Sequence, residues 1–256
     1  MSERWISFDL DGTLMQNPFV EWVFPEIDEI VSKTANRKID VKSAMFSEHL
    51  NRMRQSKIVE AYDWDDILKR YLIVNGISCE VNIEELVKKH CVSPKISLLE
   101  ENVIEVLEQL KKSGYRLAVI TNGFAKYQQP VVDTLQLSGL FDCFITPEEE
   151  NCAKPDSKII ESLMKKGEVV AHVGDRVDHD VYLAAQTNIK SVFIYRNLPK
   201  SLQNSSPYER NKDSDFLELY KQKWKKETGM KTGEVPNLPI PDIVIYSLQE
   251  LIDVFG

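Results

Sequence analysis

The sequence lacks a hydrophobic run of the length that a bilayer requires. No apolar stretch in the chain approaches the roughly 20 residues that span a membrane. The opening residues, Met-Ser-Glu-Arg-Trp, lead into a strand pattern and contain no signal-peptide core. We therefore expect a cytoplasmic protein that has no membrane partner.

An excess of positive charge is also missing. Lys and Arg number 32 against 40 Asp and Glu, so the net charge is −8. Such a chain has no positive field to attract a polyanion, and a nucleic-acid partner is not expected. Any phosphate that it binds must be held by a local site. The acidic balance favours no particular oligomeric state.

Cysteine is scarce and irregularly spaced. The four cysteines, Cys79, Cys91, Cys143 and Cys152, form no CxxC pair. This spacing argues against a zinc site and against a disulfide framework. We expect four free thiols.

Short runs rich in β-branched residues alternate with helical patterns along much of the chain. The runs cover residues 5–8, 116–121, 169–173 and 191–195. This alternation predicts an α/β fold, a Rossmann-like parallel sheet with helices on both faces. Open sheets of this kind bind ligands outside the carboxyl ends of their strands. Polar residues that follow separate strands can therefore meet in one crevice.

Residues 19–97 break this alternation, because they carry helical signals and no convincing central strand. Asp63 is a candidate N-cap for a helix that starts at residue 64, and Asn82 with Glu85 resembles a capping box. We expect an inserted all-helical cap domain here, acting as a lid over the site. A helical bundle that only stabilises the core is the alternative interpretation.

The remaining residues, 1–18 and 98–256, are expected to form the α/β catalytic core. Within them, residues 198–241 are rich in charge and proline and contain one amphipathic segment. We interpret 198–241 as an insertion that carries one helix. The apolar run Ile243–Tyr246 predicts a final edge strand.

Two carboxylates follow the first strand. Asp9 and Asp11 are two residues apart, so an extended backbone points both side chains the same way, and Gly12 lets the chain turn away. Their mutual repulsion can be offset by a divalent cation or by protonation of one carboxylate. One can then act as a nucleophile and the other as an acid and base. A simple turn that caps a helix is the alternative.

Groups suited to phosphate follow later in the chain. Thr121, Asn122 and Gly123 end the second strand, where a hydroxyl and a helix N-terminus can bind phosphate oxygens. Lys154 precedes a predicted helix and can supply the positive charge that phosphoryl transfer needs. In isolation these residues also fit an N-cap and a surface cation.

Carboxylates follow the third strand as well. Asp175 and Asp180 come after the run 169–173, and hard carboxylate oxygens suit Mg²⁺. His179 lies between them, but oxygen-rich magnesium sites rarely use imidazole. Asp175 is the candidate metal ligand, whereas Asp180 either orients Lys154 or binds a metal-bound water.

The string Phe8-Asp9-Leu10-Asp11-Gly12-Thr13-Leu14 resembles the first signature motif of the haloacid dehalogenase superfamily. The segments at Thr121, Lys154 and Gly174-Asp175 resemble its second, third and fourth motifs, in the right order. The resemblance implies that Asp9 is the nucleophile and that Asp11 is the general acid and base. True dehalogenases usually lack the second aspartate, so Asp11 favours phosphoryl chemistry.

The same resemblance implies a Mg²⁺ ion held by Asp9, the backbone carbonyl of Asp11 and Asp175. Thr121, the amides of Asn122 and Gly123, and Lys154 would hold the phosphate. We therefore expect magnesium-dependent hydrolysis of a small phosphorylated metabolite through an aspartyl-phosphate. A phosphomutase acting on a sugar phosphate and a non-catalytic phosphate-binding scaffold are the alternatives.

Overall fold

The structure is a computed structural model that describes residues 2–230 and 236–256. Six strands form its main sheet in the order β5-β4-β1-β6-β7-β8, and all neighbouring strands are parallel. The strands are β1 (Arg4–Phe8), β4 (Tyr115–Ile120), β5 (Cys143–Ile145), β6 (Glu168–Gly174), β7 (Lys190–Ile194) and β8 (Ile243–Ile245). This arrangement confirms the predicted Rossmann-like α/β fold.

Helices that precede or follow the strands along the chain cover both faces of the sheet. They are α6 (Val103–Lys112), α7 (Ala125–Thr134), η2 (Ser138–Leu140), α8 (Pro147–Glu150), η3 (Ser157–Ile160), α9 (Glu161–Met164), η4 (Val177–Val181), α10 (Tyr182–Thr187) and α13 (Glu250–Phe255). In β4, Leu117 and Val119 pack in a cluster with α6 and α7, whereas Ala118 and Ile120 pack with η3, α9 and α10. This alternation is the one expected of a strand that is buried on both faces.

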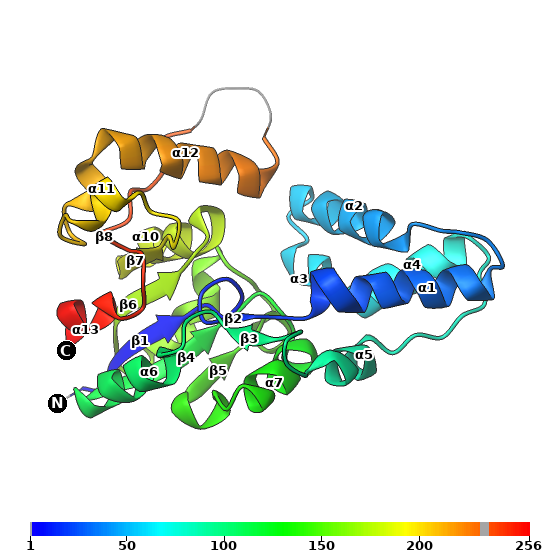
Figure 1. Cartoon of the computed structure of the whole chain (residues 1–256), viewed down its shortest axis with the longest axis horizontal. Helices are drawn as coiled ribbons and strands as arrows, with labels where there is room; N and C mark the ends of the chain where they lie inside the picture. The colour runs from blue at the N-terminus through cyan, green and yellow to red at the C-terminus, as the bar shows by residue number, and fades with distance from the viewer. Residues whose placement is uncertain (1, 231–235) are drawn as a thin grey trace.

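The chain between β2 (Met15–Gln16) and β3 (Ser97–Leu98) forms a helical unit that lies to one side of the sheet (Figure 1). Its helices are η1 (Phe19–Val23), α1 (Phe24–Thr34), α2 (Val41–Arg54), α3 (Ile58–Ala61), α4 (Trp64–Val74) and α5 (Ile83–His90). Strands β2 and β3 pair with each other antiparallel, so the chain enters and leaves this helical unit at one place.

The helix starts in the helical unit follow local capping chemistry. The Asp63 carboxylate accepts a hydrogen bond from the Asp66 amide at 3.1 Å, and α4 begins at the next residue. The Asn82 side chain accepts from the Glu85 amide at 3.1 Å at the start of α5. Both predicted N-caps are confirmed, although the Glu85 carboxylate pairs with Lys88 instead of closing a full capping box.

Aromatic side chains form much of the interior of the helical unit. The Phe24 ring lies 4.9 Å from Trp64 and 5.4 Å from Phe19. Phe19 also lies 5.5 Å from Tyr127 of α7. These rings pack the helices together and join the helical unit to the core.

The insertion at 198–241 connects β7 to β8 and contains more helix than the sequence predicts. In addition to the expected amphipathic helix, α12 (Ser214–Thr228), it forms the short helices α11 (Lys200–Gln203) and η5 (Arg210–Lys212). Helix α12 buries Phe216, Tyr220 and Trp224 against η4 and β7. Residues 231–235 of the insertion lie outside the described residues.

Strand β8 lies at the sheet edge, as predicted for the last apolar run, and the opposite edge strand, β5, was not predicted. The four cysteines, all inside the described ranges, are free thiols. Among the described residues, no helix has the length and apolarity to cross a bilayer.

Candidate active site

The carboxyl ends of β1 and β6 bring together aspartates that are far apart in the sequence. Asp9 follows β1 and Asp175 follows β6, and these two strands are neighbours in the sheet. One side-chain oxygen from each of Asp9, Asp175 and Asp180 lies within 4.8 Å of the others. These three carboxylates are therefore close enough together to hold one metal ion.

A buried lysine joins two of these carboxylates. Lys154 Nζ lies 2.6 Å from Asp9 Oδ1 and 2.7 Å from Asp180 Oδ1, and the lysine is 1% exposed. Burial by itself lowers the pKa of Lys154, but Asp180 and Asp9 outweigh it and raise that pKa. The ammonium is therefore held charged beside the predicted nucleophile.

Asp180 uses both of its oxygens to hold neighbouring protein groups. Oδ1 accepts from Lys154 and lies 3.1 Å from His172 Nε2, while Oδ2 accepts from the Arg176 amide at 2.9 Å. Of the two roles expected for Asp180, this geometry favours the orientation of Lys154.

The Asn122 side chain fixes the backbone of Lys154. Its Oδ1 accepts from the Lys154 amide at 2.7 Å, and its Nδ2 donates to the Lys154 carbonyl at 2.9 Å. Nearby, Thr121 Oγ1 accepts from the Gly123 amide at 3.1 Å. The predicted phosphate-binding segment thus also positions the predicted lysine.

Asp11 lies beside the carboxylate cluster and has a partner that sequence reasoning missed. Its Oδ2 accepts from Gln128 Nε2 at 2.6 Å, and its buried Oδ1 has no partner among the described residues. Gln128 is 3% exposed on α7, four residues after Phe124 on an otherwise apolar face. The signal in the sequence that could have revealed this residue is a glutamine on an otherwise apolar face of a helix.

The turn after Asp9 is held by a second residue that sequence reasoning missed. Gly12 has a φ of +82°, and a Cβ there would lie 2.9 Å from the Asp175 carboxylate. Arg196 donates to the carbonyls of Gly12 and Thr13 at 2.8 and 2.7 Å. Only glycine lets Asp175 approach this turn so closely.

Three buried aspartates of the site, Asp9, Asp11 and Asp175, are costly to ionise without a metal cation. Burial raises the pKa of Asp9 to about 7, against the opposing charge of Lys154. Burial also raises the pKa of Asp11 and of Asp175. A divalent cation would favour the ionised form of each carboxylate that binds it.

The donor set fits Mg²⁺. Asp175 Oδ1 is buried and has no hydrogen-bond partner within the described ranges, and the available side-chain ligands are oxygens. Burial lowers the pKa of His179 to about 3, so its imidazole is neutral at physiological pH. Its ring faces Tyr62 of the helical unit at 6.4 Å.

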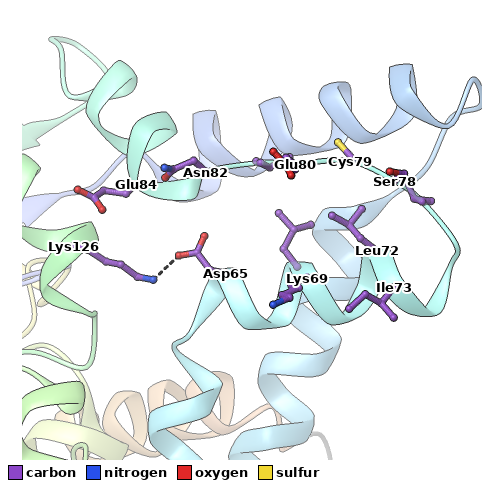
Figure 2. A pocket seen from close by; sticks show the side chains of 13 residues that line it. Asp65, Lys69, Leu72, Ile73, Ser78, Cys79, Glu80, Asn82, Glu84 and Lys126 are labelled. Carbon is purple, nitrogen blue, oxygen red and sulfur yellow. Dashed lines mark hydrogen bonds and ion pairs between the residues drawn. The ribbon is translucent and has the colours of Figure 1, made fainter.

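A cavity of about 720 Å³ lies elsewhere, between α4, residues 77–82 and Lys126 of α7 (Figure 2). At its edge, the Asp65 carboxylate accepts from Lys126 Nζ at 2.5 Å and from the Tyr127 hydroxyl at 2.9 Å. These bonds connect the helical unit to the core. The residues that line this cavity include none of the clustered aspartates, so the chemistry lies outside it.

Comparisons with known proteins agree with this site. The chain matches the family model for haloacid dehalogenase-like hydrolases over residues 3–187. It is 29% identical over 229 residues to the glyceraldehyde 3-phosphate phosphatase of Methanocaldococcus jannaschii, a match that covers 85% of this chain and 97% of that relative. It is 28% identical over 194 residues to the phosphoglycolate phosphatase of Colwellia psychrerythraea, covering 72% and 81% of the two chains.

A solved structure extends the similarity to the whole chain. The crystal structure of a HAD phosphatase from Thermococcus onnurineus superposes with a TM-score of 0.70 at 25% identity, covering 100% of this chain and 98% of that one. The family match spans β1, β4 and β6, the three strands whose carboxyl ends carry Asp9, Thr121 and Asp175. From the motifs, the fold and this match together, the chain belongs to the haloacid dehalogenase-like hydrolases.

Proposed function

We propose that this chain is a magnesium-dependent phosphatase that hydrolyses phosphate monoesters of small metabolites in the cytoplasm, with Asp9 as the nucleophile. The observation that carries the proposal is the buried contact of 2.6 Å between Lys154 Nζ and Asp9, beside the Asp175 carboxylate. The proposed nucleophile, a cation and the proposed metal ligands then lie in one site. The relatives that bear names of phosphatases support the same reaction.

The metal would be held by the side chains of Asp9 and Asp175 and by the backbone carbonyl of Asp11. When bound, Mg²⁺ would neutralise negative charge on the phosphate and hold the carboxylates in their ionised form. Asp180 would act through Lys154, since both of its oxygens already accept hydrogen bonds from the protein.

In the first step, a carboxylate oxygen of Asp9 attacks phosphorus while the bond from phosphorus to the ester oxygen breaks. Asp11 donates its proton to the departing alkoxide oxygen. Burial raises the pKa of Asp11, which favours the protonated form that this step needs. The Thr121 hydroxyl, the amides of Asn122 and Gly123, and Lys154 bind the transferring oxygens.

In the second step, the Asp11 carboxylate removes a proton from water. The water oxygen attacks phosphorus, the bond from phosphorus to Asp9 breaks, and inorganic phosphate leaves. Asp9 is then a free carboxylate again, and Asp11 is protonated for the next cycle.

The helical unit would act as the cap over this site and would select the substrate. Its Tyr62 ring lies 6.4 Å from His179, beside the loop that carries Asp175, and its Asp65 is bound to α7. The names of the relatives make glyceraldehyde 3-phosphate the first substrate to test, followed by phosphoglycolate.

Phosphate release from p-nitrophenyl phosphate and from these two metabolites, with and without Mg²⁺, tests the proposal. We expect turnover that requires Mg²⁺ and that falls on the order of 10⁶-fold in Asp9→Asn, the size found when the nucleophile of a serine protease is removed. Asp133→Asn is the matched control, because it makes the same change on an exposed part of α7. Wild-type turnover in Asp9→Asn would refute the assignment.

Asp11→Asn separates the two steps. With a good leaving group such as p-nitrophenolate, the first step needs little acid, whereas the second still needs the base. We expect phosphorylated protein to accumulate, detected as an added phosphoryl group by mass spectrometry of the intact chain. An unchanged steady-state rate would contradict the role of Asp11.

A further inference from the structure

Helix α12 of the insertion reaches the cluster of aspartates. Lys223 Nζ lies 3.4 Å from Asp175 Oδ2 and 2.9 Å from Glu227 Oε1, one turn further along the same helix. Lys223 is 20% exposed at its side chain, so this contact is largely shielded from solvent. The insertion therefore contributes a cation directly to the predicted metal ligand.

Glu227 holds the backbone that follows Asp175. Its Oε2 accepts from the Val177 amide at 2.9 Å and from the Asp178 amide at 3.3 Å. The apolar face of α12 packs against the same loop, because Val177 shares a buried cluster with Tyr220. Side chains of α12 thus contact both Asp175 and the backbone that follows it. Figure 1 shows α12, in orange, lying beside the sheet close to α10.

These contacts make the two oxygens of Asp175 unequal. Oδ2 faces Lys223, whereas Oδ1 is buried and has no partner in the described part of the chain. One oxygen is therefore available to a cation, and the other is taken by an ammonium. Mg²⁺ demands a near-octahedral shell of short bonds, whereas the larger Ca²⁺ accepts more ligands and often binds both oxygens of one carboxylate.

We propose that Lys223, held by Glu227, restricts Asp175 to binding through a single oxygen and so makes the metal site selective for Mg²⁺ over Ca²⁺. This inference rests on the proposed function, because it takes Asp175 as a metal ligand. Lys223 is a positioning residue here. Its charge also repels every divalent ion, so selectivity has to be measured as the ratio of the two dissociation constants.

Isothermal titration calorimetry with Mg²⁺ and with Ca²⁺ tests the proposal without any turnover. In Lys223→Met we expect the affinity for Ca²⁺ to rise more than the affinity for Mg²⁺. The ratio of the Kd for Ca²⁺ to the Kd for Mg²⁺ should fall by about tenfold, a usual size of effect for a residue that contacts a metal ligand. Lys225→Met removes the same charge from an exposed position of α12 and should keep the wild-type ratio.

Two further variants keep the test decisive. Lys223→Arg retains a charged donor and should preserve the ratio. Lys223→Leu removes the donor with another apolar side chain. It should narrow the ratio if the methionine variant fails to fold, which thermal unfolding reveals.

The outcomes separate this inference from the function on which it rests. Equal shifts in the two dissociation constants for Lys223→Met would show that the lysine acts through charge alone and would overturn the proposal. If the wild-type protein hydrolyses p-nitrophenyl phosphate with Mg²⁺ while Lys223→Met shows such equal shifts, only the proposed selectivity is overturned. A wild-type protein that binds neither ion would overturn both.

Discussion

The buried group formed by Lys154, Asp9 and Asp180 allows a quantitative prediction of stability. A single ammonium lies 2.6 and 2.7 Å from two carboxylates. Lys154→Met keeps most of the side-chain volume but leaves both carboxylates buried without their cation. Removal of one partner from a buried ion pair costs about 3–5 kcal/mol. Because this lysine serves two carboxylates, we expect a loss toward the upper end of that range.

Urea unfolding followed by circular dichroism measures this loss, at pH 7.5 in a buffer that contains a chelator. Lys158→Met is the matched control, because it makes the same substitution at an exposed residue four positions later. The control should change the free energy of unfolding by no more than about 0.5 kcal/mol. A loss below about 1 kcal/mol in Lys154→Met, the size for a surface pair, would refute the reasoning.

A double variant identifies the cause of the loss. In Lys154→Met with Asp180→Asn, one of the two uncompensated carboxylates is gone, and the new amide oxygen can still accept from the Arg176 amide. We expect the double variant to be more stable than Lys154→Met alone. Additive losses from the two substitutions would instead show that the charges are not coupled.

Three more predictions concern other parts of the molecule. A Cβ at Gly123 would lie 2.1 Å from Gln128 Nε2. Gly123→Ala should therefore displace Gln128 and lower kcat/KM for p-nitrophenyl phosphate by about 100-fold, the size expected when a catalytic group is slightly misplaced. Gly139→Ala, which has open space around its Cβ, should leave kcat/KM unchanged. Arg210 is 1% exposed and donates hydrogen bonds of 2.9 and 2.8 Å to the Glu250 carboxylate. Arg210→Met should therefore lower the free energy of unfolding in urea by about 3–5 kcal/mol. A loss of the size found for an exposed ion pair would contradict this reasoning. Burial lowers the pKa of His49, so the unfolded state binds the proton more readily and stability should fall as the pH drops below the unfolded pKa of about 6.5. Between pH 7.5 and 5.5 the melting temperature of His49→Gln should therefore fall less than that of the wild-type protein. An equal fall in both proteins would count against this cause.

The sequence was sufficient to predict the parts of the site that follow directly from strand ends. Asp9 and Asp175 each come straight after an apolar run, and parallel strands bring such positions to one edge of the sheet. Asp63 was equally predictable as a helix start, because capping depends on residues that are three apart. In each case the cause is local, or follows from a general rule of parallel sheets.

Contacts between separate elements could not be predicted in this way. Lys223 lies 48 residues after Asp175, and its helix also carries Lys221, Lys225 and Lys226. Nothing in that run distinguishes the lysine that turns inward. Strand β5 was missed for a different reason, because three residues are too few to show a period of two.

The pairing of β2 with β3 has a consequence for protein engineering. Gln16 and Ser97 are paired in this two-stranded ladder, so both connections between the helical unit and the core lie at the same place. A chimera joined at these two positions would replace the whole helical unit and leave the six-stranded sheet intact. Under the proposed function, such an exchange would alter the choice of substrate and leave the residues proposed to break the ester bond unchanged.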